Sequence, residues 1–410
     1  MKILQLCKKF PLPLKDGESI AVTYLSRALH ELGCEVTLLT MNTTKHYIDY
    51  ESVSDQAGHY KEVHTVDIDN TLKPVEAFKN LFSSDSYHIS RFRSDQFAQK
   101  LEEILKREEF DIVQLETLYL APYMDVIRKH SEALVVMRSH NIEHEIWDRI
   151  TQNTQFLPKK WYIKYLSKKL RNFELGVLNE YDFLVPISQR DLHKFRDLGY
   201  VNGAQTIPIG IDFKDYTPNM ASFEKNPSVS FIGSLDWIPN YEGINWFLNK
   251  VWPQVHREIP DLELHIAGRN TPDDLYQWAK SKVLIHGEVR DAREFINQHP
   301  IMIVPLLSGS GMRAKILEGM ALGKVIITTS LGLEGIPAKN KKEVLVADTP
   351  REFLNHFKFC MDQPEGMIHI SQNAQTFVKH HFNNYHLAKD LIQSYQSYMK
   401  THGFKLANPI

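Results

Sequence analysis

The segment Lys2–Thr40 begins with the run KILQLCK (Lys2–Lys8), continues with an amphipathic stretch over Ser19–Leu32 that stops at Gly33, and ends with EVTLLT (Glu35–Thr40). The two short runs are largely apolar or β-branched, as buried strands are, and the stretch between them has helical periodicity. Strand, helix and strand in direct succession form a βαβ unit, in which the two strands lie parallel. The start of the chain therefore predicts a doubly wound α/β sheet.

The same alternation continues through the first half of the chain. Residues 42–110 are less regular, and only two amphipathic stretches, near 70–82 and 90–108, stand out in them. Three further strand-like runs with helical stretches between them follow: Asp111–Glu116, Ala133–Ser139 and Phe183–Ser188.

A second alternating series begins after a change of composition. Thr206–Asp212 reads TIPIGID, and a polar stretch containing proline and asparagine follows it to Pro227. Helical segments are expected near 241–257, 272–280, 291–298, 312–322 and 349–361. The strands expected between them are Val229–Leu235, Leu262–Ala267, Val283–His286, Ile301–Leu307, Val325–Thr329 and Val344–Ala347.

We therefore expect two tandem doubly wound (Rossmann-like) domains, 1–207 and 208–382, that face each other across a cleft. A helical tail over 383–410, able to cross back to the first domain, completes the expected architecture. Open α/β sheets bind ligands at the carboxyl ends of their strands, so the loops there are the first candidates for a site.

Composition excludes several classes of protein. The 410 residues include 48 Lys+Arg and 50 Asp+Glu, and this balance argues against general binding of nucleic acid. No apolar run approaches the roughly 18 residues of a membrane span, and the N-terminal apolar stretch is too short for a signal peptide. Three scattered cysteines give no disulfide framework, so a cytoplasmic globular protein is expected.

The stretch IMIVPLLSGSGMRAKILEGMALG (Ile301–Gly323) is the strongest candidate for a binding site. A strand runs into Ser308-Gly309-Ser310-Gly311, and a helix is expected from about Met312. Glycines and a helix N-terminus can cradle an anion. Arg313 and Lys315 then fall in the first helical turn, where cations oppose the helix dipole unless an anion lies between them. This combination favours a diphosphate ligand.

Other interpretations of the same stretch remain open. Glu318, further along the helix, could accept hydrogen bonds from the vicinal hydroxyls of a ribose. An ordinary glycine-rich turn with solvated charges would look similar. Gly309, Gly311 and Ala314, with Glu334 about 20 residues on, also match a dinucleotide fingerprint, so a dehydrogenase is a third interpretation.

A second candidate is RSHNIEH (Arg138–His144), which contains the H-x-x-E-H pattern of a zinc peptidase. Zinc binding needs both histidines on one helix face, whereas His140 ends a predicted strand. A single imidazole that donates to a ligand hydroxyl, or one satisfied by backbone, fits better. Gly17, in the loop after the first strand, would let a ligand approach the backbone.

Residues 158–171 (PKKWYIKYLSKKLR) hold six basic and no acidic residues among aromatic and aliphatic ones. A basic amphipathic helix of this kind can lie on an anionic membrane. A core-packing helix with a solvated lysine face is the alternative.

Taken together, these motifs resemble the retaining glycosyltransferases of family four, the group 1 type with the GT-B fold. The resemblance covers nearly the whole chain and is most specific in the second half. The stretches that carry it are SGSGMRAKILEGMALGKVIITT with LGLEGI, PIGID, FIGSLDWIPNYEGINWF (231–247), LHIAG, HGEVRD, RSHNIEHEIW and LVPISQRD.

The resemblance implies transfer of a sugar from a nucleotide diphosphate-sugar to a hydroxyl of a glycan or lipid-linked acceptor, with retention, in polysaccharide biosynthesis. It implies no divalent metal and no cofactor beyond the donor substrate. Arg313, Lys315 and His140 become catalytic residues: the two cations neutralise the diphosphate, and His140 contacts the transferred sugar. The residues implied in donor binding are Gly17, Gly233, Val289, Arg290, Gly309, Ser310, Gly311, Met312 and Glu318.

The chain departs from the family pattern at two places. Many members carry a glutamate eight positions before the ribose-binding one, and Ser310 stands there in this chain. Many also carry an arginine and a lysine after the first strand of the second domain, where Gly233 is followed by Ser234. These departures keep a non-catalytic nucleotide-sugar binding protein on the same fold as an alternative, and a nucleotide-sugar epimerase on that fold is another.

Overall fold

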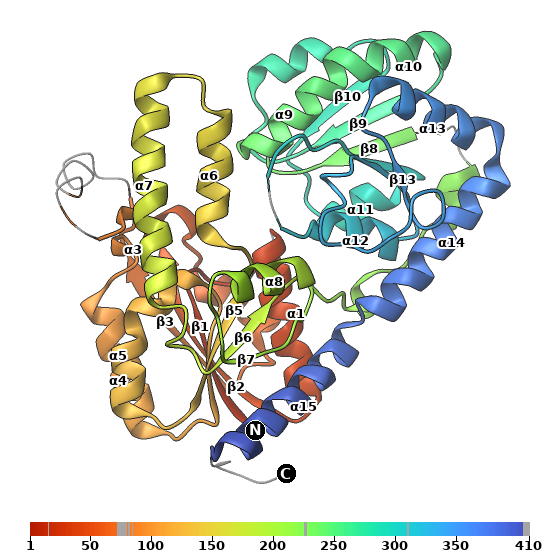
Figure 1. The fold of residues 1–410 in the computed structure, drawn as a ribbon. Helices are drawn as coiled ribbons and strands as arrows, with labels where there is room; N and C mark the ends of the chain where they lie inside the picture. Colours follow the sequence, from red (N-terminus) through yellow and green to blue (C-terminus); the bar gives the residue numbers. More distant parts are fainter. Residues whose placement is uncertain are drawn as a thin grey trace. The chain divides into compact units, whose positions relative to one another are not determined.

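The computed structural model describes residues 1–14, 16–71, 80, 83, 85–224, 228–309 and 311–404 (Figure 1). The chain divides into two compact units. The first comprises Met1–Gly210 together with Asn384–Ile410, and the second comprises Ile211–Asn383. The last helix thus belongs to the same unit as the N-terminus.

The first unit is built on a parallel sheet of seven strands in the order β3-β2-β1-β4-β5-β6-β7. Five of these strands were predicted, and two edge strands were missed because one is largely polar and the other has only two residues. The strands are β1 (Lys2–Cys7), β2 (Glu35–Thr43), β3 (Glu62–Ile68), β4 (Ile112–Leu115), β5 (Leu134–Ser139), β6 (Phe183–Pro186) and β7 (Gly203–Ala204).

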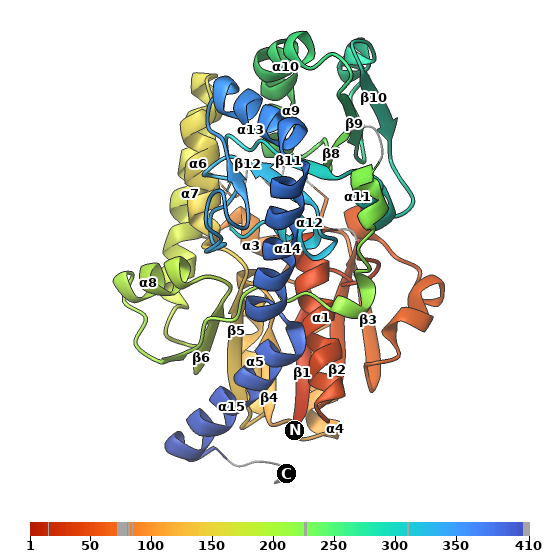
Figure 2. The ribbon, with the colours of Figure 1, turned by 90° about the vertical axis from the view of Figure 1, so that its right-hand side faces the viewer.

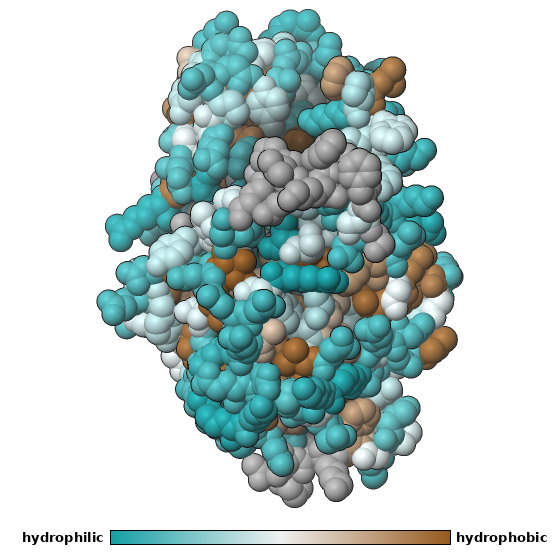
Figure 3. All heavy atoms as spheres, turned by 90° about the vertical axis from the view of Figure 1, so that its left-hand side faces the viewer, coloured by the Kyte–Doolittle hydropathy of each residue, from teal (hydrophilic) through white to brown (hydrophobic). Residues whose placement is uncertain are grey.

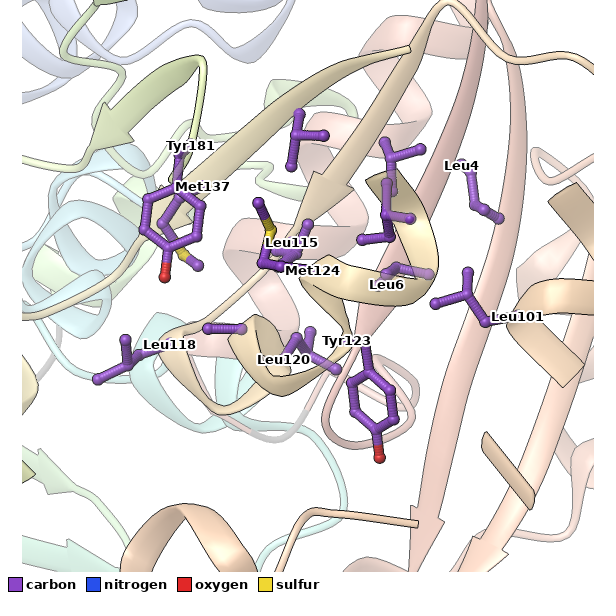
Figure 4. Packing of buried hydrophobic residues seen from close by; sticks show 14 of the residues in the cluster. Leu4, Leu6, Leu101, Leu115, Leu118, Leu120, Tyr123, Met124, Met137 and Tyr181 are labelled. Carbon is purple, nitrogen blue, oxygen red and sulfur yellow. The ribbon is translucent and has the colours of Figure 1, made fainter. Parts of the chain in front are cut away.

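Side chains alternate between the two faces of this sheet, and each face has its own hydrophobic core. Figure 4 shows one of the cores, where Leu4, Leu6 and Leu115 from the strands lie on the same side as Leu101 and Met124 from helices. These helices are α4 (Asp95–Arg107) and α5 (Met124–His130), which follows a 3₁₀ turn over Leu118–Tyr123. The predicted helix near 90–108 corresponds to α4, whereas most of 70–82 lies outside the described residues.

The other face is covered by α1 (Gly17–Glu31) and α15 (Asn384–His402), which pack against each other (Figures 1 and 2). Leu391, Tyr395 and Met399 of α15 are fully buried in this core. The C-terminal helix is therefore part of the first unit's hydrophobic core. The remaining helices of this unit are α3 (Tyr87–Ser90), α6 (Glu143–Asn153), α7 (Leu157–Gly176) and α8 (Gln189–Asp197), with 3₁₀ turns at Thr44–His46 and Tyr50–Ala57.

The second unit contains a parallel sheet of six strands in the order β10-β9-β8-β11-β12-β13, all six of them predicted. The strands are β8 (Ser228–Ile232), β9 (Glu263–Ala267), β10 (Val283–Gly287), β11 (Ile301–Val304), β12 (Val325–Thr328) and β13 (Leu345–Val346). The helices are α9 (Ile238–Trp246), α10 (Trp252–Glu258), α11 (Ala292–Asn297), α12 (Ala314–Ala321), α13 (Pro350–Asp362) and α14 (Pro364–His381).

Two predicted helices of the second unit differ in detail from the structure. The segment near 241–257 contains a π-helical turn at Phe247–Val251 between α9 and α10, and the segment near 272–280 is a 3₁₀ turn, Asp273–Trp278. The fold class is confirmed: the chain forms two doubly wound parallel sheets with a helical C-terminus. Within the described ranges, no helix combines the length and the low polarity that a membrane span requires.

Both sheets have the same topological feature. Strand order runs in opposite directions on the two sides of the first strand, so the chain switches direction between β1 and β4 and again between β8 and β11. The loops that follow such neighbouring strands diverge and leave a crevice at the carboxyl edge of the sheet, where ligands bind in doubly wound folds. Most of the candidate site residues follow the strands at these two places, whereas His140 follows β5, and Val289 and Arg290 follow β10.

Candidate functional site

The glycine-rich loop after β11 leads into α12. Gly309 and Gly311 have φ angles of 101° and 80°, a region that only glycine adopts without strain. The helix begins at Ala314, and Arg313 is its N-cap residue without capping it through the side chain. The expected start at Met312, with Arg313 in the first turn, is therefore wrong by two residues; Met312 is a buried loop residue. Ser310 lies outside the described residues.

Lys315 extends from the first turn of α12 to the end of the first strand of its sheet. Its Nζ donates to the carbonyl of Ile232 and to Oδ1 of Asn240, both at 2.9 Å, and lies 5.2 Å from the ring centre of Phe231. Burial and then repulsion by Arg313 lower the pKa of Lys315 to about 7, although Glu318 partly opposes the shift. The structure therefore holds a half-buried ammonium among neutral oxygens at the switch between β8 and β11.

Gly233 makes room for this ammonium. A Cβ at position 233 would lie 2.8 Å from Nζ of Lys315 and 2.8 Å from Nδ2 of Asn240. The loop after β8, which lacks the arginine and lysine that many members of the resembled family carry there, thus receives a cation from α12. Asn240 was not predicted to matter; it also donates to the carbonyl of Ser234 at 2.9 Å and so joins the loop after β8 to Lys315.

Glu318 lies one turn after Lys315 and is oriented by a residue that sequence reasoning missed. The hydroxyl of Tyr216 donates to Oε1 of Glu318 at 2.8 Å. Burial raises the pKa of Glu318, outweighing the hydrogen bond from Tyr216 and the charges of Arg293 and Lys315. Tyr216 follows the PIGID stretch, 102 residues before Glu318, and its aromatic hydroxyl gives no local signal of this partnership.

Val289 and Arg290 lie in the loop after β10, with Val289 half-buried and Arg290 exposed. Because the strands are parallel, this loop lies at the same edge of the sheet as the loops after β8 and β11, and β10 is two strands away from β8. The next residue, Asp291, caps α11 through the backbone N–H groups of Arg293 and Glu294. The cap fixes the backbone just after the pair.

In the first unit, a buried carboxylate organises the end of β4. Glu116 accepts from Nη1 of Arg138 (3.1 Å), Nε2 of Gln5 (2.6 Å) and Nε2 of Gln114 (2.5 Å), and lies 3.2 Å from Nε2 of His140. Burial alone would raise the pKa of Glu116, but these partners, Arg138 foremost, lower it to about 2. The Nε2 atom of His140 therefore has a carboxylate oxygen as its partner.

The two histidines of the H-x-x-E-H pattern have separate partners. His140 follows β5, whereas His144 lies on α6, where its Nδ1 is 2.6 Å from Oε2 of Glu174. Glu174 also accepts the backbone N–H groups of Glu143 and His144 and so caps α6. The zinc geometry is absent, and in the described part of the chain no three His, Cys, Asp or Glu side chains are placed to hold a metal ion.

Gly17 is the first residue of α1, close to the end of β1, and its neighbours in the chain are charged residues that form ion pairs. Asp16 caps the helix by accepting from the N–H of Ser19 at 2.9 Å, and pairs with Nζ of Lys9 at 2.6 Å. Nζ of Lys8 lies 3.3 Å from Glu18. The sequence predicted only the glycine here, because charged residues in a loop carry no signal of their pairing.

Glu143 is the most unusual carboxyl group near this edge. It is buried at the start of α6, and the hydroxyl of Tyr119 donates to its Oε2 at 3.0 Å. Burial, with repulsion by Glu174 and Glu18, raises the pKa of Glu143 to about 7, although Lys8 and Tyr119 oppose the shift. The first unit thus holds a carboxyl group that changes charge near neutral pH.

Residues 226–363, which contain this arrangement around Lys315, match the family model of glycosyl transferases group 1. This part of the chain is therefore similar to the group 1 glycosyltransferases. An uncharacterized 44.6 kDa protein in the cps region of Klebsiella pneumoniae is 23% identical over 403 residues, which cover 93% of this chain and 97% of that protein. Lys315, Glu318, Gly233, Gly309 and Gly311 all lie inside the matched residues.

Two solved structures show the fold of the whole chain. Sucrose-phosphate synthase from Thermosynechococcus elongatus superimposes with a TM-score of 0.73 at 14% identity, over 98% of this chain and all of that one. Anabaena Alr3699/HepE, solved in complex with UDP-glucose, gives 0.67 at 14% identity over 97% of this chain and all of that one. The chain therefore has the GT-B fold, and the residues that match the family model lie in its second unit.

Replacing Glu143 by Gln tests its raised pKa. The folded protein keeps the proton up to about pH 7, whereas the unfolded chain loses it near pH 4.5, so this group destabilises the fold increasingly as the pH rises between these values. The full effect is at most roughly 3 kcal/mol, at about 1.4 kcal/mol per pKa unit. The Tm of Glu143→Gln relative to the parent should therefore rise by several degrees between pH 5 and pH 8.

Glu145, two residues further along α6, is the matched control. Burial would raise its pKa, but Lys194 and Arg190 outweigh burial and lower it, so this carboxyl is ionised in both states throughout pH 5–8. Glu145→Gln should lower the Tm by a similar amount at both pH values. If the Tm difference between Glu143→Gln and the parent were also the same at pH 5 and pH 8, the raised pKa of Glu143 would be contradicted.

Proposed function

We propose that the protein transfers a sugar from a nucleotide diphosphate-sugar to an acceptor hydroxyl with retention of configuration. The observation that carries the proposal is the ammonium of Lys315, half-buried at the end of β8 inside a group 1 glycosyltransferase domain. Its hydrogen-bond partners, Ile232 and Asn240, are neutral. A desolvated cation with neutral partners is costly, and a bound anion at the adjacent helix start offsets that cost.

A diphosphate suits this site better than a single carboxylate or phosphate. Arg313 and Lys315 flank the start of α12, and Gly309 and Gly311 turn the loop backbone beside them. Glu318, held by Tyr216, supplies a carboxylate for the ribose hydroxyls. The UDP-glucose bound to Alr3699/HepE, which has the same fold, supports a ligand of this class.

The proposed reaction exchanges two bonds on one face of the sugar. The bond from the anomeric carbon to the diphosphate oxygen breaks, the bond to the acceptor oxygen forms on the same face, and the acceptor proton passes to the leaving diphosphate. Lys315 and Arg313 stabilise the negative charge that develops on the leaving oxygen. We keep for His140 the role of contacting the transferred sugar.

The acceptor is proposed to be a growing glycan or a lipid-linked sugar. The K. pneumoniae relative is named for its place in a cps region, which supports a role in polysaccharide biosynthesis. Neither a divalent metal nor a further cofactor is part of the proposal. The donor can be identified first, by thermal shift with UDP-, GDP- and ADP-sugars, and incubation without acceptor then separates transfer from epimerisation.

The central variant is Lys315→Ala. With the donor found by thermal shift, we expect the turnover to fall by about 10²–10³, as for the loss of one preorganised charge contact. Lys315→Arg keeps the charge and should recover part of the loss, which a purely structural role would not predict. Near-normal turnover of Lys315→Ala would contradict the proposed role.

Two glycine variants separate the cation's position from the stability of the fold. In Gly233→Ala the atoms nearest to the new Cβ belong to the side chains of Lys315 and Asn240 and not to the backbone, so the Tm should change less than in a backbone clash while donor affinity falls at least tenfold. In Gly268→Ala the Cβ would lie 2.0 Å from the backbone carbonyl of Gly233, so this variant should lose several degrees of Tm. Equal losses of Tm in both variants would contradict the expectation that a Cβ at position 233 displaces the cation without disturbing the backbone.

The stereochemistry of the product tests retention directly. Proton NMR of the product formed from an α-linked nucleotide sugar should show an α-anomeric signal at the earliest times. A β-linked initial product would rule out the same-face mechanism while leaving the donor site intact. The absence of any transfer, with donor-induced thermal stabilisation, would favour the binding protein instead.

A further inference from the structure

The end of the hairpin formed by α6 and α7 exposes three large hydrophobic side chains close together in sequence. Phe156, Leu157 and Trp161 are 67%, 74% and 72% exposed. In Figure 3, hydrophobic atoms lie at the end of this hairpin, at the upper right. Single exposed hydrophobic residues are common on protein surfaces, but a cluster of this size marks a contact surface.

The cluster continues along one face of α7. Trp161 and Tyr165, one turn apart, have parallel rings with centroids 6.2 Å apart. Leu157 precedes Trp161 by one turn, so the three side chains follow one line on the helix. Ile163, Leu166 and Leu170 on another face are buried and anchor the helix in its unit, while Leu157 and Trp161 are exposed and Tyr165 is half-buried.

Positive charge surrounds the exposed cluster. No Asp or Glu occurs from Arg149 to Phe173, a stretch that includes the whole end of the hairpin. The lysines of α7 that lie at its surface are Lys159, Lys160, Lys164 and Lys168. The predicted solvated lysine face is wrong at Lys169, because this side chain is buried and donates to the carbonyl of Asn80.

We propose that the end of the α6–α7 hairpin docks on an anionic lipid membrane, with Phe156, Leu157 and Trp161 inserted at the headgroup boundary. Tryptophan favours this boundary, because its ring is apolar and its N–H can reach water or headgroups. The lysines then meet anionic headgroups, where each is worth about a fivefold gain in binding. Neither apolar insertion nor charge alone anchors a protein stably, and this hairpin offers both.

The charge pattern favours lipid over a protein partner. The lysines follow the apolar tip along one helix, at 159, 160, 164 and 168, without the alternating acidic residues that set the register of a protein interface. A fluid anionic surface needs no register and accepts every lysine. The inference is independent of the proposed sugar transfer, although a lipid-linked acceptor would lie in the same membrane.

Vesicle sedimentation tests the proposal with the full-length protein. We expect binding to vesicles of phosphatidylcholine with phosphatidylglycerol at low salt, weaker binding at high salt, and little binding to phosphatidylcholine alone. The triple variant Phe156→Ser, Leu157→Ser, Trp161→Ser should lower the partition coefficient at least tenfold. Replacing the four surface lysines of α7 by Gln should do the same.

Matched controls come from exposed residues elsewhere in the first unit. Val201→Ser removes an apolar side chain that is 76% exposed, and Lys389→Gln with Lys400→Gln removes two exposed charges from α15. Neither control should change vesicle binding by more than about twofold. Unchanged thermal melting of every variant shows that a loss of binding does not come from unfolding.

A second readout locates the contact. Lipids with brominated acyl chains quench tryptophan only at close range, so they should quench the bound parent protein. Trp161→Phe should keep most of the binding and lose most of that quenching.

Three results would overturn the proposal. They are no binding to anionic vesicles at low salt, equal binding by the parent and both hairpin variants, and quenching that persists in Trp161→Phe. A dimer in sedimentation velocity that the triple variant dissociates would instead assign the cluster to contact with a second copy of the chain.

Discussion

The arrangement at the carboxyl edge of the second unit's sheet depends on one interaction, the placement of a lysine ammonium from α12 at the end of β8. Lys315 crosses the switch point of its sheet to reach the carbonyl of Ile232 and the amide of Asn240. The absence of a Cβ at Gly233 leaves the space, and Gly309 and Gly311 let the chain turn into the helix that carries the lysine. Each feature has a local explanation, but together they hold a cation where a ligand anion is expected.

The first unit also holds a charged group away from solvent at the end of a strand, but there the charge is negative. Glu116 is fully buried at the end of β4, and its ionised form survives because Arg138, His140 and two glutamine amides surround it. Gln114 extends this network to the hydroxyl of Tyr395 on α15, which donates to it at 3.0 Å. The C-terminal helix is thereby joined to the same polar network as His140, as well as to the hydrophobic core.

The sequence predicted the parts of the molecule that depend on local pattern. Buried parallel strands are continuous apolar runs, so eleven of the thirteen strands in the two sheets could be recognised, whereas polar β3 and two-residue β7 could not. Arg313 and Lys315 stood out because cations beside a glycine-rich helix start are unusual, and Glu318 because it places a carboxylate further along the same helix. Their neighbours Tyr216 and Asn240 could not be found, because they are distant in sequence and common in kind.

The account makes Lys315 the group whose charge responds to the donor, and its pKa is the most direct test. NMR of the protein labelled at the lysine ε-position, with Lys315→Arg to assign the signal, can follow the titration with and without the nucleotide sugar. The account predicts a pKa near 7 in the free protein and a rise of at least one unit when the donor is bound. An ordinary value near 10.5 that the donor leaves unchanged would contradict it.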